Sequence, residues 1–424
     1  MPGHKGVGNC GEALDITEIE GADSLFEASG IILESEKNAS LLFGSNTFYS
    51  TEGSSLCIRA MVFLLSLYAK EKQTRPTILA GRNAHKAFLS AIALTDVSVE
   101  WLTASQNASY LSCPISACEL DELFKSTSSL PTAVYLTSPD YLGNVSDIKE
   151  IASVCHKHGV LLCVDNAHGA YLRFLTPSRH PIDLGADICC DSAHKTLPVL
   201  TGGAYLHISK SAPSIFSEQA KNALCLFGST SPSYLILRSL DMANAYLEGH
   251  AERLVRFMPM LCELRRALTD GGYTLIGNEE LKITIAAKTY GYTGIELAKL
   301  LAKENVICEF ADPDYLVLML TPENDESDLK KAKKALLSID KKEPLSFSAQ
   351  SFSLPKKILS VREAMTSVSE RITVDSACGR ILASASVGCP PAVPIVISGE
   401  RIDENAIRIM KYYGIEYCFV IKES

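Results

Sequence analysis

A lysine just after a short apolar run is the first residue that could do chemistry. Residues 185–196 read GADICCDSAHKT, and Ala186–Cys190 has the pattern of a buried strand. Ser192, His194 and Lys195 follow at the strand's carboxyl end, the edge at which open α/β sheets bind ligands. A lysine there can bind phosphate, act as a general base or form a Schiff base, and the alternative is a solvated loop lysine.

A carboxylate closes a neighbouring apolar run. In LLCVDNAHGA, residues 161–170, Asp165 ends the run, and His168 and Gly169 follow. A carboxylate at the end of a buried strand is costly unless it meets a cation or several hydrogen-bond donors. We therefore expect Asp165 either to face a metal ion, an arginine or a protonated ring nitrogen, or to cap the next helix.

Two further segments carry polar groups at expected helix starts. In TEGSSLCIRAM, Gly53 precedes Ser54 and Ser55 and then a strongly apolar helix. Backbone N–H groups and hydroxyls at such a start either bind a phosphate or simply cap the helix. His85, in GRNAHK, follows the expected strand Thr77–Ala80. It is either a structural or solvated histidine or a site residue at the sheet edge.

Together these features are more specific than any one of them. A phosphate cradle, a histidine that can stack on a ring, a buried carboxylate for a pyridinium nitrogen and a reactive lysine are the parts that hold pyridoxal 5'-phosphate. In that arrangement the carboxylate keeps the ring nitrogen protonated, so that the ring accepts electrons from a bond broken at Cα.

The elements that must position these residues alternate between strands and helices. Short apolar runs alternate with helical patterns between about residues 40 and 210, which predicts an α/β fold with a mostly parallel sheet covered by helices. The expected strands are Thr77–Ala80, Val97–Leu102, Ala133–Thr137, Leu161–Asp165, Asp187–Asp191 and Gly203–Ile208, and the expected helices include Ser54–Lys70, His85–Leu94 and Asp147–His158.

The rest of the chain predicts two smaller units. A long helical stretch over Ser233–Leu268 leads out of the large domain, and the polar stretch Lys341–Gln350 has the composition of a linker. Between them we expect strands at Leu281–Ala287, Val306–Phe310 and Tyr315–Leu320, with helices at Gly294–Glu304 and Glu326–Ile339. The expected domains are a cofactor-binding large domain with an N-terminal arm over 1–240, a small α+β domain over 241–340, and a linker with a C-terminal domain over 341–424. Within the last, the proline-rich PPAVPIVISGE cannot be a central strand throughout.

Composition excludes several classes of protein. Of 424 residues 47% are hydrophobic and 21% charged, as in ordinary globular chains, and a net charge of −9 disfavours nucleic-acid binding. No signal core and no run of 18 or more apolar residues is present, so we expect a cytoplasmic protein without a membrane partner and regard three NxS sequons as chance matches. The scattered cysteines do not suggest disulfides. Cys155–His158 reads as a helix end rather than a metal site, and no metal is predicted.

A series of longer motifs carries a family resemblance. In order they are MPGHKG, LDITEIEG, the EGSS turn, RNAHK, TSPDYLGNVSDI, VDNAHGAYL, SAHKTLPVLTGGAYLHI and STSPSYLILRSLD, and they span about residues 1–242. Together they closely resemble the bacterial ornithine/lysine/arginine decarboxylases, which are fold type I (aspartate aminotransferase-like) pyridoxal-phosphate enzymes. The remainder resembles that family's small and C-terminal domains more loosely. The chain resembles a short form without the N-terminal wing domain.

The resemblance implies roles for individual residues. Lys195 corresponds to the Schiff-base lysine, Asp165 to the partner of the pyridine nitrogen, and His85 to the histidine stacked on the ring. His194 is a further catalytic candidate that helps protonate Cα, together with Lys195. Phosphate-site positions and a histidine beside the cofactor complete the set: Gly53, Ser54, Ser55, Ser192, His194 and His168.

The family's active site lies at a dimer interface, so the resemblance also implies a homodimer. Thr230 and Ser231 match a segment that reaches the phosphate in the other subunit. The implied reaction is decarboxylation of a basic amino acid, arginine or lysine ahead of ornithine, to an amine of the polyamine type and CO2. Two alternatives remain: another fold type I reaction, such as aminotransfer or acyl transfer, and a non-catalytic homologue.

Three positions depart from the family pattern. Glu52 stands where asparagine is usual, Asn166 where glutamate is usual, and Gly202 where glutamine is frequent. A carboxylate at Glu52 would repel a phosphate unless it points away. We expect these changes to alter substrate choice or to weaken activity. The chain also begins at the PGHK motif, which suggests that Met1 is an internal methionine of the natural product, and the missing wing favours a dimer or small oligomer.

Overall fold

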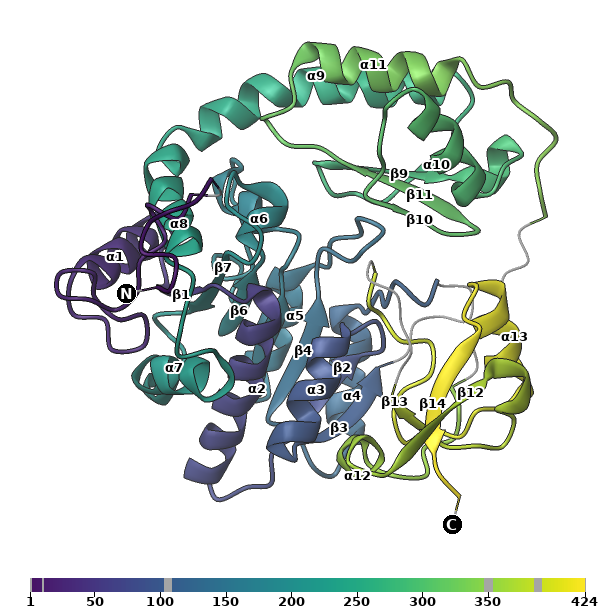
Figure 1. Ribbon diagram of the computed structural model, residues 1–424. Coiled ribbons are helices and arrows are strands. Elements are labelled where there is room, and N and C mark those ends of the chain that lie inside the picture. The colour runs from purple at the N-terminus through teal and green to yellow at the C-terminus, as the bar shows by residue number, and fades with distance from the viewer. Residues whose placement is uncertain (1, 10, 103–108, 347–353, 385–390, 424) are drawn as a thin grey trace.

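Three β-sheets organise the computed structural model of the chain (Figure 1). The structure describes residues 2–9, 11–102, 109–346, 354–384 and 391–423. The largest sheet lies in the first half of the sequence, a four-stranded sheet follows it, and a three-stranded sheet lies near the C-terminus.

The large sheet has seven strands in the order β1-β7-β6-β5-β4-β2-β3. The strands from β3 to β6 along this order are parallel, while β7 and β1 are antiparallel additions at one edge. The predicted α/β fold with a mostly parallel sheet is therefore confirmed, and each predicted strand of the sheet is present. The strands are β1 Asn46–Ser50, β2 Thr77–Gly81, β3 Ser98–Leu102, β4 Ala133–Thr137, β5 Leu161–Asp165, β6 Ile188–Asp191 and β7 Ala204–Ile208.

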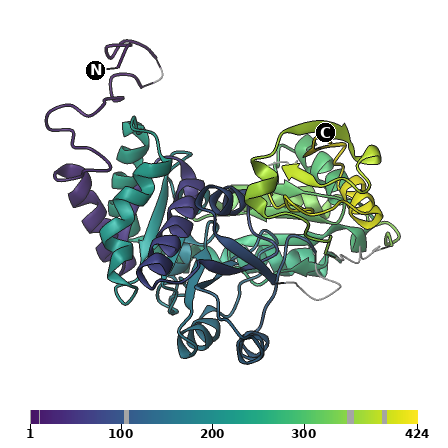
Figure 2. The same ribbon diagram turned by 90° about the horizontal axis from the view of Figure 1, so that it is seen from below.

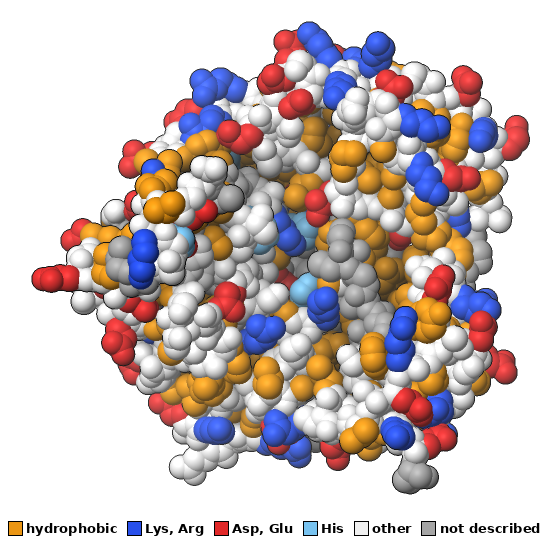
Figure 3. Space-filling model, viewed as in Figure 1, with side chains coloured by type: hydrophobic (Ala, Val, Ile, Leu, Met, Phe, Trp, Pro, Cys, Tyr) orange, Lys and Arg blue, Asp and Glu red, His pale blue; other side chains and the backbone are white. Residues whose placement is uncertain are grey.

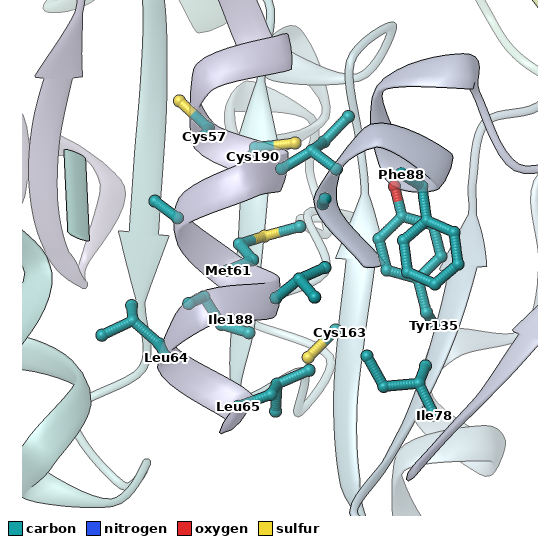
Figure 4. Close-up of a cluster of buried hydrophobic side chains, with 14 of the residues drawn as sticks. Cys57, Met61, Leu64, Leu65, Ile78, Phe88, Tyr135, Cys163, Ile188 and Cys190 are labelled. Atoms are coloured by element: carbon teal, nitrogen blue, oxygen red, sulfur yellow. The ribbon is translucent and has the colours of Figure 1, made fainter. Parts of the chain in front are cut away.

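Helices cover both faces of this sheet. Successive strand residues point to opposite faces, so that Ile188 and Cys190 pack under α2 and α3, while Cys189 packs on the α4 and α5 side. Figure 4 shows the first of these cores, in which Phe88 and Tyr135 stack with ring centroids 4.1 Å apart. The helices are α1 Ile31–Phe43, α2 Gly53–Glu71, α3 Lys86–Thr95, α4 Ala117–Ser126, α5 Ile148–Lys157, α6 Ala193–Thr196 and α7 Ser214–Phe227.

Helix α2 is long and apolar enough, by length and composition, to cross a membrane. It is instead a core helix. Ten of its side chains are buried, and Leu56, Met61 and Leu65 belong to the cluster that packs on the sheet. No other helix within the described ranges passes the same test of length and hydropathy.

The helical stretch expected over Ser233–Leu268 is two helices. Helix α8 covers Tyr234–Leu247 and helix α9 covers His250–Asp270, with a break at Glu248 and Gly249. The predicted helical stretch is therefore confirmed, while the break at Gly249 was not predicted because apolar periodicity continues on both sides of it.

The four-stranded sheet is antiparallel and has the order β10-β11-β9-β8. The strand expected over Val306–Phe310 is much shorter than predicted, because only Phe310 and Ala311 pair with β11. A core of leucine and tyrosine side chains joins this sheet to α9, α10 and α11. Its elements are β8 Leu275–Ile276, β9 Lys282–Ala286, α10 Gly294–Lys303, β10 Phe310–Ala311, β11 Tyr315–Met319 and α11 Glu326–Leu337.

The C-terminal sheet lies beside the β3 end of the large sheet (Figures 1 and 2). As expected for a proline-rich stretch, residues 391–400 form no strand. They run past the loop that follows β2, where the Lys86 amide donates to the Ala392 carbonyl at 2.9 Å. The elements of this unit are α12 Val361–Met365, β12 Ser369–Thr373, β13 Leu382–Ser384, α13 Glu404–Tyr412 and β14 Tyr417–Ile421.

Candidate active site

A cavity of about 420 Å³ opens at the carboxyl ends of the parallel strands. On the face shown in Figure 3 the molecule is hollowed near its centre, and histidine and lysine side chains lie in the hollow. Except for Thr230 and Ser231, every residue predicted for the site lines this cavity: Gly53, Ser54, Ser55, His85, Asp165, His168, Ser192, His194 and Lys195. They come from four different strand-to-helix junctions.

Lys195 lies on α6, the single helical turn that follows β6. Its Nζ is 3.0 Å from Nε2 of His168, which follows β5 and is buried. Burial, and then the charge of Lys195, lowers the pKa of His168 well below its ordinary value. A neutral His168 can accept a hydrogen bond from the Lys195 ammonium at Nε2. The two residues can therefore share a proton.

Two more histidines flank this unit. Burial, and then the charges of Lys195 and Lys86, lowers the pKa of His85 to about 4. Burial also lowers the pKa of His194, whose Nδ1 lies 3.0 Å from the Gly203 carbonyl. All three histidines are therefore neutral at pH 7, and an uncharged imidazole can pack against an aromatic ring at little electrostatic cost.

Asp165 lies at the floor of the cavity and is only 2% exposed. Its donors include neutral groups: the Tyr135 hydroxyl at 3.3 Å, the Ala167 amide at 3.2 Å and the Cys190 thiol at 3.7 Å. Burial raises the pKa of Asp165, although the nearby charge of Lys195 opposes the rise. A buried carboxylate of this kind favours a cationic group in front of it.

The amino end of α2 faces the same cavity. Gly53 begins the helix with φ +69° and donates its amide to the Gly202 carbonyl at 2.7 Å. No side chain caps the helix, and the Ser192 hydroxyl donates to the Ser54 hydroxyl at 2.8 Å. Uncapped first-turn amides beside three serine hydroxyls form a candidate anion site.

The structure accounts for Glu52, the most troubling departure from the family pattern. Its carboxylate does not line the cavity and instead accepts a hydrogen bond from the Ser229 amide at 2.6 Å. Glu52 thus points away from the anion site and supports the turn between α7 and α8.

The other two departures from the family pattern, at Gly202 and Asn166, also have structural explanations. Gly202 has φ +100°, and a Cβ there would lie 2.7 Å from the Thr51 carbonyl oxygen, so a larger residue needs a different backbone. Asn166 donates to Asp191 Oδ1 at 2.6 Å, while His180 and His207 contact Asp191 Oδ2 at 3.1 Å each. Asn166 therefore belongs to a fully buried polar cluster beneath the site.

Thr230 and Ser231 lie outside this cavity. They are exposed in the turn between α7 and α8, where the Ser231 amide donates to the Ser229 hydroxyl at 3.1 Å. Their predicted role concerns the other subunit and stays a prediction.

Several cavity residues were not predicted from the sequence. Thr137 ends β4 and Tyr141 follows it, so their positions at the sheet edge could have indicated them, as for His85 after β2. Three further residues of the lining come from the units built around the two smaller sheets: Glu309, Pro391 and Val393. No motif in the sequence near them indicates a place in the site. The remaining unpredicted residues of the lining are Asn83, Leu111 and Ala167.

The histidines near the end of α5 face different partners. Nε2 of His156 lies 3.1 Å from Asp187, and Nε2 of His158 lies 2.6 Å from Asp121. The stretch forms a helix end, as expected. Among the described residues, the one group of ligand-type side chains compact enough to hold a metal ion is His180, Asp191 and His207.

Comparison with solved structures supports the same architecture. The lysine decarboxylase LdcF of Francisella novicida superposes with a TM-score of 0.78 at 18% identity, covering 99% of this chain and 78% of that chain. Lysine decarboxylase A from Pseudomonas aeruginosa also gives 0.78 at 18% identity, covering 97% and 73%. At this level of identity the similarity concerns the fold.

Comparison with known sequences identifies the family. An uncharacterized protein of Bacillus subtilis (strain 168), YaaO, is 30% identical over 424 residues, which cover 93% of this chain and 84% of YaaO. The arginine decarboxylase of the same organism is 27% identical, covering 96% of this chain and 88% of that enzyme. The family model described as Orn/Lys/Arg decarboxylase, major domain, matches residues 7–269, and that of the C-terminal domain matches 349–418. The chain therefore belongs to the Orn/Lys/Arg decarboxylase family.

Proposed function

We propose that this protein removes the α-carboxylate of a basic amino acid as CO2, with arginine or lysine ahead of ornithine, and that it uses pyridoxal 5'-phosphate. The observation that carries the proposal is that Lys195, Asp165 and His85, from three different junctions, line one cavity. Membership of the decarboxylase family and the curated arginine decarboxylases along most of the chain support the reaction.

The residues of the cavity fit the cofactor. The uncapped start of α2, with Ser54, Ser55 and Ser192, would hold the phosphate. Asp165, whose burial is costly without a cation, would face the protonated ring nitrogen. Lys195 would hold the cofactor covalently. When bound, pyridoxal phosphate supplies a ring that accepts the electron pair left at Cα as CO2 departs.

The protein's own groups would orient the substrate and handle the proton. His85, neutral at pH 7, would lie against the cofactor ring and fix the plane of the ring. The orientation of that plane determines which bond at the substrate's Cα stands perpendicular to the ring. His168 would accept a hydrogen bond from Lys195 Nζ and so hold that nitrogen in place. Lys195, with His194 on the same helical turn, would return a proton to Cα.

We further propose a cytoplasmic homodimer with the active site at its interface. Residues 2–9 and 11–21 form no helix or strand and project from the body (Figure 2), with Val7 and Leu14 exposed. Exposed apolar side chains on such an arm favour a second copy as their cover. Thr230 and Ser231 would then complete the partner's phosphate site. The units 1–240, 241–340 and 341–424 would act as the cofactor, small and C-terminal domains.

Product analysis tests the reaction. The purified protein, supplied with pyridoxal phosphate, is incubated separately with arginine, lysine and ornithine, and gas release and products are measured. We expect CO2 and the corresponding amine from at least one of them. An oxo acid without CO2 would show aminotransfer instead, and uptake of the cofactor with no product from any substrate would reject the reaction.

A further inference from the structure

We infer that a smaller cavity beside the candidate active site binds a phosphate group or a similar small oxyanion. This cavity has a volume of about 150 Å³ and lies between α2, α3 and the C-terminal unit. It shares Ser55 and His85 with the larger cavity, whereas Lys195 and Asp165 line the larger one alone. The inference therefore concerns a site outside the one proposed for the cofactor.

The lining of the smaller cavity carries positive charge. Its charged side chains are Arg59 of α2 and Lys86 of α3, and no aspartate or glutamate is among the described residues of the lining. Hydroxyl donors accompany them: Ser55, Ser90, Ser384 and Ser398. A guanidinium, an ammonium and hydroxyl groups are the side-chain donors that bind phosphate oxygens in proteins.

The two cations have no counter-ion within the described part of the chain. Neither Arg59 nor Lys86 forms an ion pair there. Together with burial and the charge of Lys195, their charges lower the pKa of His85 to about 4. The cations thus act on this wall of the cavity without compensation, which favours an anion between them.

Ser398 gives a second and independent indication of a ligand. Its side chain lines the cavity and is only 3% exposed, and its hydroxyl has no hydrogen-bond partner among the described residues. A buried hydroxyl without a partner costs free energy, and a serine hydroxyl can rotate to meet an acceptor. An oxyanion in the cavity would supply the acceptor that Ser398 lacks.

The backbone brings these groups together from distant parts of the sequence. Ser55 and Arg59 are four positions apart on α2 and therefore share one face of it. Helix α3 begins at Lys86, so the positive end of its dipole lies at the cavity. The Lys86 amide also donates to the Ala392 carbonyl at 2.9 Å, which ties the segment that carries Ser398 to this helix. The site is therefore complete only when the C-terminal unit is packed against α3.

Phosphate binding to the cofactor-loaded protein tests the inference. Loading fills the anion site at the start of α2, and calorimetry in a phosphate-free buffer then measures the affinity for inorganic phosphate. We expect saturable binding, and we expect Lys86→Gln and Arg59→Gln each to lower the affinity by about 10-fold or more. Lys303→Gln, which removes an exposed lysine at the end of α10, should leave the affinity unchanged.

Ser398→Ala separates binding from folding. Because the hydroxyl has no partner, its removal should not lower the thermal unfolding midpoint measured without phosphate. The same change should lower phosphate affinity several-fold. A lower midpoint together with unchanged affinity would show that Ser398 acts in packing and not in binding, and would count against the site.

The ring of His85 provides a further readout. A bound anion offsets the charges of Lys86 and Arg59, so phosphate should raise the pH at which the labelled His85 ring titrates in the cofactor-loaded protein. Lys86→Gln should reduce this effect of phosphate. A titration of His85 that phosphate leaves unchanged would place any bound phosphate elsewhere and overturn the inference.

Two ligands distinguish the possible sources of the phosphate group. Tighter binding of inorganic phosphate than of glycerol 3-phosphate would support a site for the free ion, and the reverse would support a site for a phosphate ester. The inference is overturned if neither ligand binds saturably, or if Lys86→Gln and Arg59→Gln bind both as the unmodified protein does. CO2 release plays no part in these measurements, so failure of the proposed reaction and failure of this inference are distinguishable. Without cofactor uptake, the two variants would still identify the smaller cavity, because neither Lys86 nor Arg59 lines the larger one.

Discussion

Arg82 and Glu400, separated by 318 positions in the sequence, form a buried ion pair with Nη2 and Oε2 2.8 Å apart. Arg82 also donates to the Ile395 carbonyl at 3.1 Å. The pair attaches the 391–400 segment to the loop after β2, directly before Asn83 and His85 of the cavity. Through it, the C-terminal unit supplies part of the wall of the candidate active site.

Breaking this ion pair should strongly destabilise the packing of the 391–400 segment against the loop after β2. Arg82→Met leaves Glu400 buried without its cation, and such a loss costs about 3–5 kcal/mol. The double variant Arg82→Met/Glu400→Gln removes both charges and should recover part of that loss. Urea unfolding of the single and double variants measures the coupling, and fully additive losses would show that the two residues do not act as a pair.

Asp165→Asn should weaken cofactor binding and slow decarboxylation by about 100-fold or more, because a neutral amide no longer favours a protonated ring nitrogen. Affinity for pyridoxal phosphate, measured by absorbance titration, and the rate of CO2 release check this. The amide has nearly the same shape as the carboxylate, so the thermal unfolding midpoint without cofactor should not fall. An unchanged rate would remove Asp165 from the site.

Asn166→Asp should destabilise the protein without any change in volume. It would replace the donor to Asp191 Oδ1 with a second carboxylate in a fully buried cluster. We expect a loss of about 2–4 kcal/mol. The exposed change Asn222→Asp serves as the control and should be close to neutral. Equal unfolding midpoints for the two variants would contradict the proposed role of Asn166.

His85 should stay uncharged well below neutral pH. Burial and neighbouring lysines lower its pKa to about 4, against 6.5 for an ordinary histidine. The folded state therefore binds fewer protons at this residue than the unfolded state between these values. The contribution of His85 to the free energy of unfolding is therefore complete above about pH 6.5 and is lost as the pH falls toward 4.

Carbon-13 labelling of histidine rings checks this directly. The ring signal that is missing in His85→Gln identifies His85 in the spectrum of the unmodified protein without cofactor. We expect its chemical shift to stay constant from pH 8 to about 5.5. A titration with a midpoint near 6.5 would show that the residue is solvated.

The edge of the large sheet could be predicted because its signals are local. Lys195, Asp165 and His85 each follow a short apolar run, and parallel strands bring their carboxyl ends together. The resemblance added the roles of these residues, and the structure adds their geometry. Strand β1 was missed because Asn46–Ser50 is half polar and gains its stability from pairing with β7.

The far wall of the site could not be predicted for a different reason. Glu309 and Val393 reach the cavity only after three separate sheets have packed together. No periodicity near either residue indicates that contact, since their partners lie far away in the sequence. The length of helix α8 was similarly hidden, because its end at Leu247 depends on a local break rather than on a change of pattern.

The most direct test of the proposed activity is CO2 release by the purified protein against the variant Lys195→Ala. Arginine and lysine labelled at the carboxyl carbon are supplied with pyridoxal phosphate, and released CO2 is counted at pH 7. The account predicts labelled CO2 from at least one of the two and a loss of at least about 1,000-fold in the variant. Equal release by the unmodified protein and Lys195→Ala, or none from the unmodified protein with cofactor bound, would contradict it.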